Sequence, residues 1–249
     1  MPAIKVPGAR TAPELDAHLE VPPVGEGPWP AVVVLHEAFG LNDDIRQQAS
    51  KLAAAGYLAL APDLFTAGGA RRCIRSTFKS LIDGEGDAFA DIEACRGFMA
   101  GHGQSTGSVG VIGFCMGGGF ALLSAARGFD AAAPNYGAIF AAEEELTELL
   151  RGACPLVASY GARDRLIPGH GPKLDRALRA SGVEHDFKLY PEAGHSFLNR
   201  PSMGPLVGSL MRVTTGVGFH GPSAEDAWAR ILRFFDEHLG EQAAAAQLD

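Results

Sequence analysis

The glycine-rich segment at residues 113–119 constrains the fold of this chain more than any other feature. It reads Gly-Phe-Cys-Met-Gly-Gly-Gly, follows an apolar run at 108–112 and precedes a helix-like stretch at 120–126. A strand, a tight turn bracketed by glycines and a helix, with one reactive side chain at the apex, form a nucleophile elbow. We therefore predict that Cys115 projects from the end of a strand.

The predicted position of Cys115 favours a reactive thiol. The backbone N–H of Met116 lies at the expected start of the next helix, where free donors and the positive helix end stabilise a thiolate and a developing oxyanion. Taken alone, the segment is equally compatible with a buried cysteine in an ordinary turn, because free cysteine is among the most buried residue types. The choice between a catalytic and a structural cysteine therefore depends on whether partner residues occur elsewhere in the chain.

Composition and charge narrow the class of protein. The 249 residues, 47% of them hydrophobic, can bury a large core, and α/β folds of this length often form one unit. A net charge of −8 disfavours nucleic acid and anionic membranes as partners. No apolar run reaches the roughly 20 residues of a membrane-spanning helix, and no signal peptide is evident. Four cysteines without C-x-x-C spacing indicate a reduced, cytoplasmic protein.

Strand-like and helix-like segments alternate along the chain. Apolar, β-branched runs predict strands, and apolar residues at helical spacing predict helices. Beyond a strand or two before residue 30, the predicted strands lie at 31–35, 57–61, 108–112, 130–136, 156–160 and 185–190. The predicted helices lie at 43–55, capped by Asn42 or Asp43, and at 88–99, 120–126, 143–150 and 172–180, with a last helix after residue 223.

This alternation predicts a single α/β domain over residues 1–249, with a mostly parallel central sheet and helices on both faces. The Gly-rich segments 64–87 and 198–221 are predicted to be irregular, and a connection as long as the first is usually a functional loop or carries short helices. Ser223 and Asp226 resemble a capping box at the start of the last helix.

Three of the predicted strands end in loops that carry a potential catalytic side chain. The loops supply Cys115, Asp164 and His195, and nucleophile, acid, histidine is the chain order of an α/β-hydrolase. His195 can take the proton of the thiol while Asp164 holds the other ring nitrogen. Singly, a turn aspartate or one of eight histidines has an ordinary structural explanation. Together, at three strand ends and in this order, they favour a catalytic triad.

These motifs resemble those of the dienelactone hydrolase family. The resemblance is carried by the cysteine elbow, by Ala-Arg-Asp-Arg-Leu-Ile-Pro, Gly-His-Ser-Phe and His-Glu-Ala-Phe-Gly-Leu-Asn, and by Ala-Pro-Asp-Leu and Asn-Tyr-Gly. It extends from about residue 31 to the final helix, and the elbow is its most specific element. It implies an α/β-hydrolase fold and a carboxylic ester or lactone hydrolase of the EC 3.1.1 class. Cys115, His195 and Asp164 would form the triad and pass through an acyl-thioester.

The resemblance also implies roles near the first predicted strand. Glu37 matches a glutamate that interacts with the resting cysteine in the family, so it is expected to control when the thiolate is exposed. Its alternative is a solvated loop carboxylate. The N–H groups of Met116 and Ala38 are expected to form the oxyanion hole.

The chain departs from the family where dienelactone is bound. Enzymes that act on dienelactone hold its carboxylate with two arginines, and the matching positions here are Ala67 and Asn199. The resemblance therefore does not extend to the two arginines that bind the carboxylate of dienelactone. Candidate substrate contacts are Arg71, Arg72, Tyr136, Phe39, Asn199 and Arg200.

No metal or other cofactor is expected. No two histidines have the i, i+4 spacing of a zinc motif, and the elbow lacks the lysine of a phosphate-binding loop. The expected partner is a small ester or lactone, and the expected assembly is a monomer or small homo-oligomer. The alternative function is a non-catalytic ligand-binding or redox-sensing protein on the same fold, in which Cys115 oxidises to a sulfenic acid.

Overall fold

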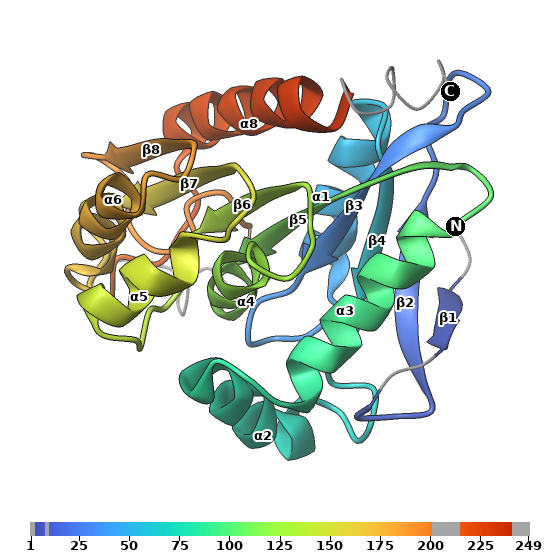
Figure 1. Ribbon diagram of the computed structural model, residues 1–249, viewed down its shortest axis with the longest axis horizontal. Coiled ribbons are helices and arrows are strands. Elements are labelled where there is room, and N and C mark those ends of the chain that lie inside the picture. The colour runs from blue at the N-terminus through green and yellow to red at the C-terminus, as the bar shows by residue number, and fades with distance from the viewer. Residues whose placement is uncertain (1–2, 8–9, 201–214, 241–249) are drawn as a thin grey trace.

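Eight strands form one mostly parallel sheet in the computed structural model, which describes residues 3–7, 10–200 and 215–240 (Figure 1). The strand order is β1-β2-β4-β3-β5-β6-β7-β8. β2 pairs antiparallel with β1 and β4, and the pairs from β4 to β8 are parallel, as predicted. The strands are β1 (Ala3–Pro7), β2 (Glu14–Glu20), β3 (Trp29–Leu35), β4 (Leu58–Pro62), β5 (Ser105–Phe114), β6 (Ala131–Asn135), β7 (Leu156–Gly161) and β8 (His185–Tyr190).

Helices cover both faces of the sheet, which confirms the predicted α/β-hydrolase architecture (Figure 1). They are α1 (Asp43–Ala54), α2 (Ala70–Asp83), α3 (Asp87–Ala100), α4 (Met116–Ser124), α5 (Glu143–Leu150), α6 (His170–Ser181) and α8 (Gly221–Phe235), which continues into the π-helical turn η1 (Asp236–Gly240). α1 and α8 pack on the face that includes Val32 and Val34, and α2 to α6 pack on the face that includes Val33 and Leu35. Burial of both faces explains why β3 is a continuous apolar run.

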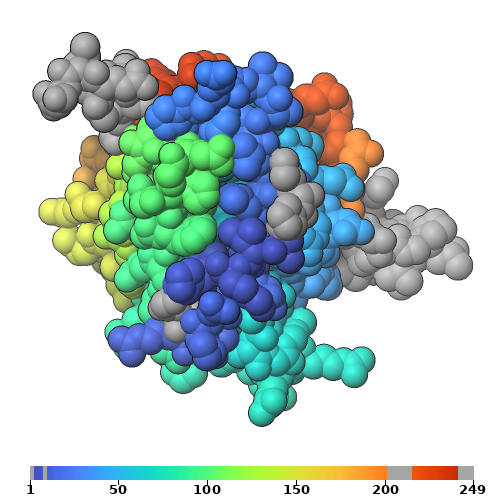
Figure 2. Space-filling view, turned by 90° about the vertical axis from the view of Figure 1, so that its right-hand side faces the viewer, coloured from blue at the N-terminus to red at the C-terminus, as the bar shows by residue number. Residues whose placement is uncertain are grey.

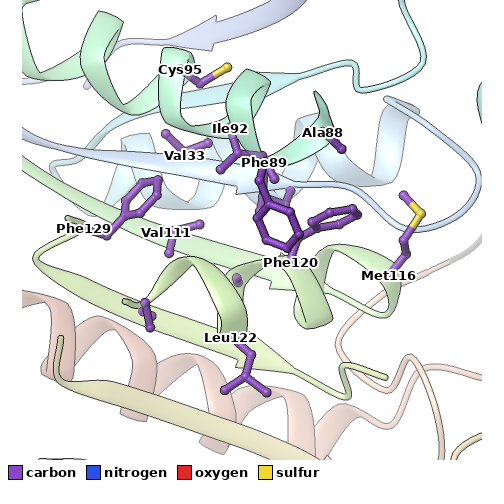
Figure 3. Close-up of a cluster of buried hydrophobic side chains, with 14 of the residues drawn as sticks. Val33, Ala88, Phe89, Ile92, Cys95, Val111, Met116, Phe120, Leu122 and Phe129 are labelled. Atoms are coloured by element: carbon purple, nitrogen blue, oxygen red, sulfur yellow. The ribbon is translucent and has the colours of Figure 1, made fainter. Parts of the chain in front are cut away.

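Figure 3 shows part of the core next to the elbow, where aromatic rings pack among aliphatic and sulfur-containing side chains. Phe89 of α3 and Phe120 of α4 meet edge to face, with 4.9 Å between their ring centroids. Val33 and Val111 of the central strands lie in the same cluster. This packing fixes α4, and therefore the turn that precedes it, against the sheet.

The N-terminal strands lie on the side of the molecule that faces the viewer in Figure 2, where dark blue residues meet the cyan and green of α2 and α3. Asp91 of α3 is fully buried and accepts hydrogen bonds from the N–H groups of Arg10 and Thr11 and from the Thr11 hydroxyl. These bonds tie the start of the chain to α3. Within the described ranges, no helix has both the length and the apolarity to cross a bilayer.

The segment 64–87 was predicted to be irregular, as a functional loop or with short helices, and the structure shows that it carries a helix, the whole of the 14-residue α2. Its buried face consists of Cys73, Thr77 and Leu81, at the i, i+4, i+8 spacing of one helical stripe. Gly69 and Gly84 flank the helix rather than interrupt it, and Gly84 adopts the left-handed conformation of a C-terminal cap.

The ends of two other helices test the capping predictions. Asn42 caps α1, since its side chain accepts the N–H of Ile45. The capping box at Ser223 is wrong: α8 begins at Gly221, and the side chain of His220 accepts the Ser223 N–H at 3.4 Å. Asp226 instead accepts hydrogen bonds from side chains of β8. Most of the predicted irregular segment 198–221 lies outside the described residues.

Candidate active site

Cys115 lies in a strained turn between β5 and α4. Its φ is 54° and its ψ −113°, values that side-chain-bearing residues rarely adopt. A Cβ atom at Gly113 would lie 1.9 Å from the carbonyl oxygen of Gly117, and one at Gly117 would lie 2.2 Å from that of Leu35. The turn therefore requires both glycines, and the start of α4 packs directly on the end of β3.

Replacing Gly117 with alanine is expected to destabilise the protein by about 3 kcal/mol, because the new methyl group would overlap a backbone that cannot rotate away. Urea unfolding measures the loss. Gly97→Ala is the matched control: Gly97 lies in α3 with nothing within 4 Å of its ideal Cβ position. The control should gain up to about 1 kcal/mol from helix propensity. Equal stabilities of Gly117→Ala and the wild type would contradict this account of the elbow.

Asp164 and His195 meet beyond the ends of β7 and β8. His195 Nδ1 lies 2.6 Å from Asp164 Oδ2, and both side chains are 4% exposed. The other carboxylate oxygen, Oδ1, accepts the N–H groups of Leu166 and Ile167, which fixes the carboxylate. With Nδ1 donating to Asp164, the lone pair of the neutral ring is on Nε2.

Cys115 lies close to this ring and is one of the groups that raise the pKa of His195. Nε2 of His195 is buried and has no hydrogen-bond partner of normal geometry among the described residues. The thiol is nevertheless close enough to influence the ring. Burial alone would lower the pKa of His195, but the hydrogen bond that its ring donates to Asp164 and the interaction with Cys115 raise that pKa to about 10. Hydrogen bonds in a resting site are often long and tighten when substrate binds.

A short segment at 215–218 joins the loops that carry Asp164 and His195. Gly218 N–H donates to the carbonyl of His195 at 3.0 Å, and Thr215 accepts the N–H of Arg165 at 3.2 Å. A Cβ atom at Gly194 would lie 1.8 Å from the carbonyl oxygen of Gly216. The two loops are therefore held in register by close backbone packing.

Glu37 is buried, and its carboxylate points to the histidine loop. Its Oε1 accepts a hydrogen bond of 2.6 Å from Ser196 Oγ, and it makes no hydrogen bond to Cys115 within the described residues. Burial raises the pKa of Glu37, although the Ser196 hydrogen bond and the nearby His195 oppose that shift. Glu37 is thus not a solvated loop carboxylate, and its neutral form is favoured relative to an exposed glutamate.

Glu37→Gln is expected to stabilise the protein at pH 8 but not at pH 4.5. The folded-state pKa of Glu37 lies above the unfolded value, so the stability of the wild type declines relative to the variant as pH rises past 4.5. Thermal unfolding at both pH values should show a gain of about 3 °C at pH 8 only. Glu26→Gln, at an exposed position, serves as the control and should show no such difference. A gain that is equal at both pH values would contradict the buried-carboxyl account.

Tyr136 and Asn199 belong to a buried polar network. The Tyr136 hydroxyl donates to Asn199 Oδ1, and Asn199 Nδ2 donates to Asp44 of α1. Neither Tyr136 nor Asn199 has exposed surface, and the Tyr136 ring lies 5.3 Å from that of His195, centroid to centroid. Arg200 donates its backbone N–H to Asp44. Both atoms of the Asn199 amide are therefore engaged inside the protein.

The remaining predicted contacts lie on the surface. Phe39 is 63% exposed beside Ala38, and Arg71 and Arg72 are exposed in the first turn of α2. The structure brings neither arginine into contact with the triad. The guanidinium of Arg200 stacks on Phe219 at 3.8 Å from the ring centroid.

The backbone N–H groups of Met116 and Ala38 are both free to donate a hydrogen bond to a ligand. Neither donates to an acceptor within the part of the chain that the structure describes. Met116 begins α4, so its N–H has no partner within the helix. The contact of Gly117 with Leu35 places this helix end against the backbone that leads to Ala38.

Backbone strain identifies one residue that the sequence did not. Among the described residues other than glycine, only Cys115, Tyr136 and Ser196 have positive φ, and all three lie in this site. Ser196 was missed although it follows His195 in the Gly-His-Ser-Phe motif, because its sequence gives no sign of its bond to Glu37. No group of three or more His, Cys, Asp or Glu in the described ranges could hold a metal ion.

Comparisons with known proteins agree with this architecture. The sequence profile of the dienelactone hydrolase family matches residues 15–239. A Yersinia pestis protein with the provisional name carboxymethylenebutenolidase is 31% identical over 243 residues, which are 90% of this chain and 84% of that protein. The carboxymethylenebutenolidase of Pseudomonas putida is 30% identical over 190 residues, 72% of this chain and 79% of the relative.

A crystal structure gives the same result. A Klebsiella pneumoniae protein provisionally assigned as a dienelactone hydrolase superposes with a TM-score of 0.73 at 28% identity, covering 94% of this chain and 97% of that one. The profile match covers nearly the whole chain, and the resemblance in fold is equally extensive. The protein is therefore a hydrolase that belongs to the dienelactone hydrolase family.

Proposed function

We propose that the protein hydrolyses small carboxylic esters or lactones with Cys115 as nucleophile, His195 as proton carrier and Asp164 as its orienting acid. One observation carries the proposal: the buried His195 is held at Nδ1 by Asp164, its Nε2 has no hydrogen-bond partner in the described part of the chain, and Cys115 is close enough to raise its pKa. Such an arrangement can move a proton between a thiol and a leaving group.

In the proposed acylation step, His195 takes the proton of the Cys115 thiol, and the thiolate attacks the substrate carbonyl carbon. The carbonyl oxygen becomes an oxyanion that accepts hydrogen bonds from Met116 N–H and Ala38 N–H. When the tetrahedral intermediate collapses, the C–O bond to the leaving group breaks. His195 gives its proton to the departing alkoxide, which leaves an acyl-thioester on Cys115. For a lactone, the alkoxide remains attached to the acyl group.

In the proposed deacylation step, neutral His195 removes a proton from a water molecule as that water attacks the thioester carbon. The second tetrahedral intermediate uses the same two N–H groups. The C–S bond then breaks and releases the carboxylic acid, and Cys115 and His195 return to the resting pair. Asp164 stabilises the imidazolium in both steps without itself taking the proton.

The proposed substrate class is an ester or lactone with an uncharged acyl part. The names of the Yersinia and Pseudomonas relatives point to a lactone that carries a carboxylate, but Asn199 lies inside the protein and Ala67 has no charge. Neither position offers a cation for such a carboxylate. We also propose that residues 1–249 act as one domain without a cofactor, and that Glu37, whose charged form is disfavoured by burial, controls when the thiolate of Cys115 is exposed.

Iodoacetamide inactivation tests the proposed nucleophile. The rates of hydrolysis of p-nitrophenyl acetate and of a panel of lactones should decline in proportion to the alkylation of Cys115. Peptide mass spectrometry measures the extent of alkylation. Cys154 is the matched control because it is also a half-buried free cysteine, and its thiol pKa is raised by burial to about 12. Cys154→Ala should be as active, and as sensitive, as the wild type. Full activity after complete alkylation of Cys115 would overturn the proposal.

A further inference from the structure

His36, directly after β3, is held in one tautomer by the hydrogen bonds of its two ring nitrogens. The side chain has no exposed surface. Nε2 lies 3.0 Å from the backbone nitrogen of Leu64, and Nδ1 lies 2.6 Å from the carbonyl oxygen of Glu37. A backbone N–H can only donate, so Nε2 accepts from Leu64 and the ring proton is on Nδ1. Asp63 lies farther from Nε2, at 3.6 Å, and accepts the N–H of Phe65 instead.

The hydrogen bond from His36 determines the orientation of the peptide between Glu37 and Ala38. In a planar trans peptide the carbonyl and the following N–H point in opposite directions. The Glu37 carbonyl accepts from His36 Nδ1–H and, at 3.2 Å, from Gly40 N–H. The Ala38 N–H therefore points away from the His36 ring, and it has no acceptor among the described residues.

The loop after β4 holds His36 in place. Leu64 supplies the hydrogen bond to Nε2, and the ring of Phe65 packs on the imidazole with 4.8 Å between centroids. This loop follows the Ala-Pro-Asp-Leu motif at 61–64, for which the proposed chemistry has no other use. A buried, hydrogen-bonded support of this kind suits a donor that must be oriented before the oxyanion forms.

We propose that His36 is a positioning residue for the oxyanion hole: by donating Nδ1–H to the Glu37 carbonyl, it aims Ala38 N–H at the oxygen of the reacting carbonyl. This inference rests on the proposed hydrolysis at Cys115. His36 touches neither the substrate nor the thiol, and acts only through the peptide that it orients.

Two variants of similar shape test the role of the donor. His36→Gln keeps an amide N–H that can reach the Glu37 carbonyl, whereas His36→Met fills the same space without a donor. We expect His36→Met to lower the turnover of p-nitrophenyl acetate about 30-fold, mainly in kcat, because the donor is misaimed rather than removed. His36→Gln should stay within a few-fold of the wild type. His18→Met, at a second buried histidine that pairs with Glu20, should leave turnover unchanged.

The rate at which iodoacetamide alkylates Cys115 separates a misaimed donor from a general packing defect, because only the packing defect would change that rate. The thiolate displaces iodide in that reaction and no carbonyl oxyanion forms, so His36→Met should be alkylated at the wild-type rate. Turnover of His36→Met within threefold of the wild type would overturn the inference. Equal losses of turnover in His36→Met and His36→Gln would also overturn it, as would a fall in the alkylation rate of His36→Met that parallels its fall in turnover. A wild type without esterase activity would instead refute the proposed function.

Discussion

Replacing Cys115 with alanine is expected to lower ester turnover by at least about 10⁴-fold, because no other group at the elbow can form the acyl bond. The fold should remain intact, since alanine at 115 is smaller than cysteine and keeps the β-carbon that the strained turn already accommodates. Turnover of p-nitrophenyl acetate and of the hydrolysed lactones, with thermal unfolding in parallel, measures both effects.

Cys73→Ala provides the matched control for this substitution. Cys73 is a free cysteine in the buried face of α2, where its thiol donates to the Phe65 carbonyl. It should lose stability and keep its turnover. If Cys115→Ala hydrolysed esters within tenfold of the wild-type rate, the nucleophile would have to be another residue, and the non-catalytic interpretation of Cys115 would gain support.

Replacing Asp164 with asparagine is expected to lower turnover by about 10³- to 10⁴-fold. The asparagine oxygen can still accept the N–H groups of Leu166 and Ile167, so the loop should persist. Its amide NH₂ would then face Nδ1 of His195 and favour the tautomer with the proton on Nε2, which cannot take the proton of the thiol. Steady-state kinetics measures the effect.

The same substitution should change the pH dependence of the site. Asp164 is one of the groups that raise the pKa of His195 to about 10, so its loss should lower the pH at which the imidazolium loses its proton. The pH profile of Cys115 alkylation reports this shift. Asp226→Asn, which changes a surface carboxylate paired with Lys188, should alter neither turnover nor the profile. An Asp164→Asn variant with wild-type kinetics would contradict the assigned role.

Much of the fold could be predicted from local sequence patterns. The buried strands read as continuous apolar runs, and Asn42 is a strong N-cap residue, so β3 and α1 were recognisable. α2 was not predicted because its flanking glycines and exposed arginines are typical of a loop, and its buried stripe has only three residues, Cys73, Thr77 and Leu81. The start of α8 was missed because a histidine cap has no common sequence signature.

In the candidate site, too, some residues could be predicted from local sequence patterns and others could not. Cys115, Asp164 and His195 could be selected because each follows a strand, and a parallel sheet collects its strand ends at one edge. The partners of these residues could not be selected, since the bond between Ser196 and Glu37 and the network from Tyr136 to Asp44 join segments far apart in the chain. Asn199 was expected at the substrate, whereas its burial places it in that network.

The most direct test of the proposed mechanism is capture of the acyl-enzyme. The wild type should be mixed with p-nitrophenyl acetate, quenched in acid within one turnover and digested for mass spectrometry. We predict one acetyl group on the peptide that contains Cys115, and hydroxylamine should remove it, as it cleaves a thioester. The acetylated form should accumulate to a higher level in Asp164→Asn if that substitution slows deacylation more than acylation. Ester turnover with acetyl on any other residue, or with no thioester at Cys115 in either protein, would contradict the account.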